Sequence, residues 1–140
     1  MADFLGIPYP VRPNSLGFFH SQGGANQIKS DLLILLLTNP GERCFLPDFG
    51  TPLRSLIFEP NDAALEIRAK KMIINAIQQW EPRIVIQQIQ VSSKTDNELL
   101  NYLDDKSEVS HILWIKIMFV DPQNIKEVQE LKLEIPLSGA

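Results

Sequence analysis

Apolar residues recur at helical spacing in two stretches of the chain. The first predicts a helix over about residues 25–37 with Asn26 as its N-cap, amphipathic at its start and apolar on all sides towards its end. The second predicts a longer helix over about residues 61–79, capped by Asn61 or Asp62. Its buried stripe follows three-four spacing and comprises Leu65, Ala69, Met72, Ile73, Ala76, Ile77 and Trp80.

The apolar period changes to that of strands after Pro82. Isoleucine and valine alternate with polar residues over 84–91, and the phase slips at residues 87–88, which predicts a β-bulge. Residues 111–120 are almost continuously apolar, as is typical of a central strand covered on both faces. Residues 131–137 alternate again and predict a half-buried last strand. The pattern therefore predicts an α+β fold, with two main helices packed on a small, mostly antiparallel three-stranded sheet.

Prolines and glycines divide the rest of the chain. They interrupt residues 1–24 so often that we expect an extended N-terminal arm, followed by a single domain over 25–140. The arm is too apolar to remain solvated, so it either wraps its own domain or docks on a neighbouring chain. Gly50 is expected in a turn conformation, and residues 53–58 in one or two helical turns. Residues 92–110 form a polar excursion that is too long for a tight hairpin.

Composition excludes several classes of function. The chain has 140 residues, a net charge of −4 and no dense run of Lys or Arg, which argues against a nucleic-acid-binding protein. The N-terminus lacks the pattern of a signal peptide, and the most apolar run, residues 32–37, is far shorter than a membrane span. A single cysteine, Cys44, and two separated histidines predict no disulfide and no metal site. Since no phosphate-binding glycine loop is present, we expect no cofactor and no small-molecule substrate.

One catalytic hypothesis remains, a pair of carboxylates for glycoside hydrolysis. Such enzymes need one acid with a raised pKa and one ionised partner. Each candidate lies beside Pro or Gly in turn-forming sequence, where structural carboxylates are common, so we expect no catalytic residues and no enzyme activity. The candidates are Glu42, Asp48, Glu59 and Glu81.

The segment around Pro82 has a second interpretation. Pro82 forces the preceding residue into an extended conformation, so Glu81 and Arg83 should point to the same side of a stiff connector. They form either a surface ion pair, of little consequence for stability, or a contact point for a partner. Spacing alone leaves both possibilities open.

Three motifs in order resemble the GPW/gene 25 product-like family. They are Leu35-Leu36-Leu37-Thr38-Asn39-Pro40-Gly41-Glu42-Arg43, Leu46-Pro47-Asp48-Phe49-Gly50-Thr51 and Trp80-Glu81-Pro82-Arg83-Ile84, with Leu56-Ile57-Phe58-Glu59-Pro60 between them. The resemblance covers about residues 25–137. The excursion over 92–110 is longer than the family pattern, and the arm is less family-like, so the partner of the arm stays open.

The resemblance implies a structural protein of the contractile phage tail baseplate, located in the virion and assembled in the host cytoplasm. It implies that Glu81, Pro82 and Arg83 dock on the helical bundle of other wedge subunits. It also implies that the C-terminal strands pair with the tail sheath and start its first ring, through residues that include Leu131, Leu133 and Ile135. The tail tube is a further possible partner. The alternatives are a subunit of a type VI secretion or extracellular injection system, and a lysozyme-like peptidoglycan hydrolase.

Overall fold

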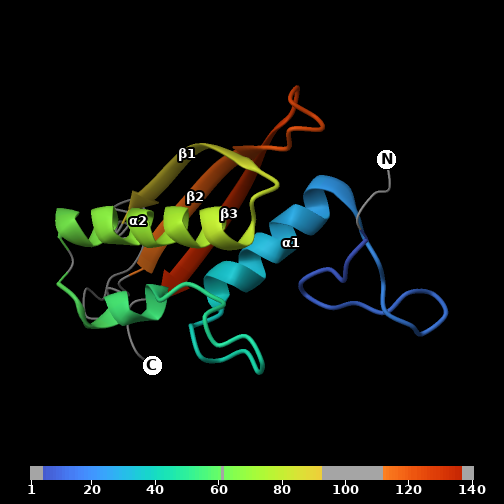
Figure 1. Ribbon diagram of the computed structural model, residues 1–140, viewed down its shortest axis with the longest axis horizontal. Helices are drawn as coiled ribbons and strands as arrows, with labels where there is room; N and C mark the ends of the chain where they lie inside the picture. The colour runs from blue at the N-terminus through green and yellow to red at the C-terminus, as the bar shows by residue number, and fades with distance from the viewer. Residues whose placement is uncertain (1–4, 61, 93–111, 137–140) are drawn as a thin grey trace, which may run out of the picture.

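A computed structural model describes residues 5–60, 62–92 and 112–136. Helices α1 (Gly24–Leu37) and α2 (Ala63–Trp80) are joined through a short 3₁₀ helix, η1 (Leu53–Phe58). Strands β1 (Val85–Ser92), β2 (Ile112–Val120) and β3 (Val128–Pro136) form one antiparallel sheet in the order β1-β2-β3. Figure 1 shows α2 lying across one face of this sheet, with α1 leading away from it towards the N-terminal arm. The predicted α+β fold is confirmed.

The two helices start differently. The carboxylate of Asp62 caps α2 and accepts a hydrogen bond from the Leu65 N–H at 2.9 Å, as one of the two predicted caps required. The prediction of Asn26 as the cap of α1 was wrong, because the helix begins at Gly24 and Gly23 occupies the N-cap position. Gly24 has a φ of +64°, a conformation that glycine adopts readily. It changes the chain direction between the arm and α1, and no side chain caps the helix there.

The sheet confirms the predicted bulge and the central position of β2. The register between β1 and β2 shifts between Ile86 and Gln88. The expectation that β2 is covered on both faces was wrong, because its side chains alternate between buried and half-buried. One face points into the core, and the other carries the half-buried Trp114, Lys116 and Met118. The residues of that outer face are long and partly apolar, so the sequence hid the alternation.

The core lies between the sheet and the two helices. Its fully buried side chains include Leu32, Leu35, Leu36, Leu53, Leu56, Leu65, Ile73, Ile77, Leu113, Ile115, Ile117 and Phe119. Gly50 has a φ of +125°, and a Cβ there would lie 2.4 Å from the carbonyl oxygen of Thr38, which explains the glycine. The predicted helical turns over 53–58 are present as η1. The polar excursion, apart from Ser92 at the end of β1, lies outside the described residues.

The described part of the arm packs its base on α1 and exposes its tip. Two isolated bridges, Gly6 with Gln22 and Pro13 with Phe19, fold it back on itself. Apolar side chains at the tip remain open to solvent, with Leu16 79% exposed and Phe18 71% exposed. The arm therefore wraps its own domain only in part.

Candidate functional site

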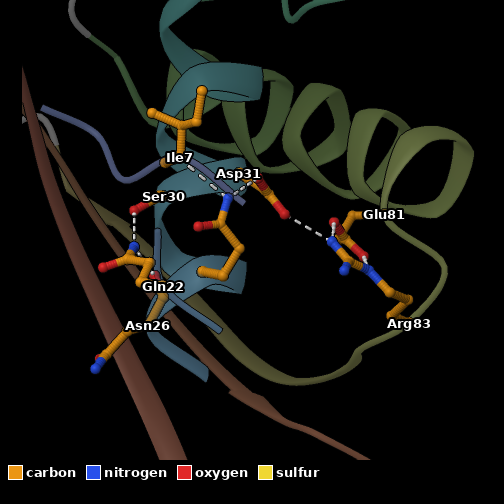
Figure 2. Close-up of polar contacts among 8 residues, drawn as sticks. Ile7, Gln22, Asn26, Ser30, Asp31, Glu81 and Arg83 are labelled. Atoms are coloured by element: carbon orange, nitrogen blue, oxygen red, sulfur yellow. Dashed lines mark hydrogen bonds and ion pairs between the residues drawn. The ribbon is translucent and has the colours of Figure 1, made fainter. Parts of the chain in front are cut away.

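The connector between α2 and β1 is held by an ion-pair cluster. Arg83 donates from Nε to Glu81 Oε1 at 2.5 Å and from Nη2 to Glu81 Oε2 at 2.6 Å. Its Nη2 also donates to Asp31 Oδ2 on α1 at 2.7 Å. Figure 2 shows the guanidinium between these two carboxylates. The ion pair of Glu81 with Arg83, one of the two possibilities that the spacing left open, is present, and it extends to a second helix.

One carboxylate of this cluster is buried, and the other two side chains are partly exposed. Glu81 is 6% exposed, whereas the side chain of Arg83 is 38% exposed and that of Asp31 is 32% exposed. The hydrogen bonds to Glu81 raise the pKa of the Arg83 guanidinium above its ordinary value, and partial burial opposes them. The guanidinium is thus fixed at one orientation while part of it, with the neighbouring Pro82, faces solvent.

Asp31 was missed by the sequence analysis. It lies 52 residues before Arg83 and on the polar side of α1, so no local pattern pairs the two residues. Its other oxygen, Oδ1, accepts a hydrogen bond from Gln27 Nε2 at 2.8 Å, and the same nitrogen contacts the Ile7 carbonyl oxygen at 3.3 Å. A continuous set of polar contacts therefore runs from the arm through α1 to the connector (Figure 2).

A cleft of about 590 Å³ lies beside the connector. The Phe49 and Trp80 rings meet edge to face with centroids 5.3 Å apart, and the Arg43 guanidinium lies 4.7 Å from the centre of the Phe49 ring. These contacts join all three motifs of the sequence at one surface. The cleft is lined by Asp31, Ile34, Leu35, Thr38, Glu42, Arg43, Phe49, Trp80 and Glu81.

The candidate carboxylates do not form an acid and base pair for hydrolysis. Glu42 and Glu81 line this cleft together, but Asp48 and Glu59 do not. The backbone N–H and side chain of Asn39, with a smaller effect of Arg54, lower the pKa of Glu42, the opposite of what a general acid needs.

The other carboxylates have structural surroundings. Both oxygens of Glu81 accept hydrogen bonds from Arg83, and Glu59 forms an ion pair with Arg68 at 2.7 Å. In the described residues, no group of three potential metal ligands comes together, and no helix is long and apolar enough to cross a membrane.

The last strand presents its backbone to the surface. The side chains of Leu131 and Ile135 are 6% and 7% exposed, and Leu133 packs against the same core. These side chains are therefore committed to the fold. In the described part of the sheet, β3 pairs with β2 on one side and lies at the edge on the other. A partner strand would meet backbone N–H and C=O groups there.

Comparison with known proteins identifies the chain's relatives. The family model described as baseplate wedge protein gp25 matches residues 22–117. The baseplate wedge protein gp25 of Enterobacteria phage T4 is 26% identical over 116 residues, which cover 83% of this chain and 78% of that protein.

Two solved structures share the fold. One is a proposed tail lysozyme from Geobacter sulfurreducens, with a TM-score of 0.67, 22% identity, and coverage of 85% of this chain and 96% of that one. The other is a chain of the anti-feeding prophage baseplate, with a TM-score of 0.61, 17% identity, and coverage of 97% and 87%.

Proposed function

This chain belongs to the baseplate wedge protein gp25 family, and we propose that it is a structural subunit of a contractile-tail baseplate. The observation that carries this proposal is the family match over residues 22–117, which includes all three sequence motifs, both helices, β1 and part of β2. The relative from phage T4 is itself named for the baseplate wedge. On this proposal the chain functions in the tail baseplate of the virion. Its assembly into the baseplate takes place in the host cytoplasm.

The connector Glu81-Pro82-Arg83 is the proposed contact with other wedge subunits. Glu81 is buried and holds Arg83, so its role is to position the guanidinium. Pro82 and the exposed part of Arg83 form the contact surface. A rigid connector loses little conformational entropy on docking, and a planar guanidinium suits carboxylate or carbonyl oxygens at helix ends.

A neutral double variant separates docking from stability. Glu81→Gln with Arg83→Gln removes both charges while keeping polar side chains, so the buried position 81 holds no unpaired charge, and the partly exposed Asp31 keeps its hydrogen bond from Gln27. We expect the variant to fold but to enter baseplates at least about tenfold less well, as measured by its amount in purified particles. Glu59→Gln with Arg68→Gln, an ion pair at the start of α2, is the matched control. Equal incorporation of both variants would rule out the connector as a docking site.

The edge of β3 is the proposed contact with the tail sheath, whose first ring this chain would start. Because Leu131, Leu133 and Ile135 face the core, their part is to hold the strand in place, and the backbone of β3 makes the pairing. The tail tube, which such a ring surrounds, is a further proposed neighbour.

Hydrogen exchange tests this pairing. The purified chain is compared alone and with the purified sheath protein of the same particle. We expect the β3 amides that point away from β2 to become protected in the complex, while those paired with β2 change little. Unchanged exchange along all of β3, in a sample where the sheath protein assembles on the chain, would contradict the proposal.

We infer that the chain is not a peptidoglycan hydrolase, although it shares the fold of a proposed tail lysozyme. Fold alone carries no activity, the pKa of Glu42 is lowered, and both oxygens of Glu81 accept hydrogen bonds from Arg83. A cell-wall release assay should give no signal above background. Activity that is lost in Glu42→Gln or Glu81→Gln would overturn this inference.

The kind of contractile system is a separate question. The chain shares its fold with a chain of the anti-feeding prophage baseplate, and a type VI or extracellular injection system is the second candidate. Genes adjacent to this one distinguish them: tail fibre and capsid genes indicate a phage, and their absence beside secretion or toxin genes indicates an injection system.

A further inference from the structure

A second groove lies between the N-terminal arm, α1 and β3. We call it the arm groove, and its volume is about 590 Å³, within the range of sites that take ligands or peptide segments. Its walls are formed by Pro8, Tyr9 and Pro10 of the arm, by Lys29 and Leu33 of α1, and by Leu131 of β3. It does not share a lining residue with the cleft beside the connector.

Buried hydrogen bonds hold the groove open. Ser30, which is 4% exposed, accepts a hydrogen bond at Oγ from the Tyr9 N–H at 3.1 Å. It accepts a second one from Gln22 Nε2 at 2.7 Å (Figure 2). Gly6 and Gln22 exchange two backbone hydrogen bonds of 2.9 Å. The arm segments around Tyr9 and Gln22 are thus both fixed to α1 on one side of the groove, so an incoming segment meets a formed surface.

The charge of the arm groove is opposite to that of the whole chain. Arg12 and Lys29 line it with His20, and none of its described lining residues is acidic. Neither Arg12 nor Lys29 forms an ion pair with a carboxylate of the described residues, whereas the chain carries a net charge of −4. Two cations that have no acidic partner among the described residues, at one preformed groove, favour a negatively charged occupant.

We propose that the arm groove binds an extended, acidic segment of another baseplate subunit. The groove combines cationic side chains with a tyrosine, prolines and leucines, which suits a peptide with carboxylate and apolar side chains. Two cations are too few for the basic stripe of a nucleic-acid site. This proposal rests on the proposed baseplate role, and it assigns the arm a partner different from those of the connector and of β3.

Photo-crosslinking in assembled particles tests the occupant. A photoreactive amino acid replaces His20, which is exposed and lines the groove, and in a control chain it replaces Lys70 on α2. We expect His20 to crosslink to one subunit, at a segment whose mapped sequence is net acidic. A neutral or basic segment, a crosslink to nucleic acid, or no crosslink above the Lys70 control would overturn the proposal. Particles that lack the chain altogether would instead contradict the baseplate role.

Charge reversal tests the chemistry of the groove. Arg12→Glu with Lys29→Glu should lower the His20 crosslink about tenfold or more, because like charges would then face each other. Lys70→Glu with Lys71→Glu changes the net charge equally on exposed residues of α2 and should leave the crosslink unchanged. If the charge-reversed variant does not fold, Arg12→Gln with Lys29→Gln provides the same test, with a smaller expected decrease in the His20 crosslink. An undiminished crosslink in a folded variant of either kind would overturn the proposal.

Discussion

The connector and the N-terminal arm both contact α1, yet they differ in how much of their surface the fold uses. At the connector, Glu81 is buried and its two oxygens accept hydrogen bonds from Arg83. At the arm, only the base is bonded to α1, and the groove cations and the apolar tip face solvent. In the connector, the side chains of Glu81 and Arg83 thus bond to each other, whereas the arm is anchored at its base and leaves its tip exposed.

Removing Arg83 should have the largest effect on stability. Arg83→Ala leaves the buried carboxylate of Glu81 without its partner, and we expect a loss of about 2 kcal/mol in the free energy of unfolding. The loss is smaller than for a fully buried pair because the guanidinium is partly exposed. Urea denaturation measures it. A loss below about 0.5 kcal/mol would mean that the cluster contributes no more than a surface ion pair.

Asp31→Asn should weaken both regions at once. It removes the charge that Arg83 contacts and weakens the link through Gln27 to the arm, so we expect a loss of about 1 kcal/mol. The amides of Gly6 and Gln22 should exchange several-fold faster in the same variant. If stability falls while exchange in the arm stays the same, the two regions are independent.

Gly6→Ala should loosen the arm and leave the domain intact. A Cβ at Gly6 would lie 2.4 Å from Gln27 Nε2, so that side chain must move and its bond to the Ile7 carbonyl oxygen is disturbed. We expect global stability to change by less than about 0.5 kcal/mol, because the clash is with a flexible side chain. Faster exchange at Gln22 with an unchanged urea midpoint is the expected result. A large shift of that midpoint would show that the arm is part of the cooperative core.

The smallest effect is expected at the tip of the arm. Phe18→Ser with Phe19→Ser removes two rings that are 71% and 70% exposed. The free energy of unfolding, measured by thermal denaturation, should therefore change by less than about 0.5 kcal/mol. A loss above about 1 kcal/mol would mean that the tip packs on the domain in solution, and the contrast between the two regions would fail.

The sequence predicted what depends on local patterns. The stripe from Leu65 to Ile77, the cap at Asp62 and the bulge at residues 87–88 are each set by neighbours within a few positions, and all are present. Glu81 and Arg83 also lie together, although the predicted extended segment is absent: residues 82–83 form a turn, and Glu81 has φ −130° and ψ 68°.

Features set by distant contacts could not be predicted. Asp31 meets Arg83 only because α1 packs beside the connector, and Ser30 anchors the arm for the same reason. The one-sided burial of β2 was hidden because the outer face carries Trp114 and Met118, which read as core residues. The side chains proposed for sheath pairing lie in the core. The alternation of apolar and polar residues predicted that one face of the strand is buried, but it could not predict which groups a partner would meet.

A complementation experiment tests the structural role most directly. In a strain that lacks this gene, intact contractile tails are counted by electron microscopy, with and without the gene supplied from a plasmid, and the chain is quantified in purified particles. We predict no intact contractile tails without the gene, recovery with the wild-type chain, and the chain present in the recovered baseplates. Normal numbers of intact tails in the absence of the gene would contradict the proposal that this chain is a structural subunit of the baseplate.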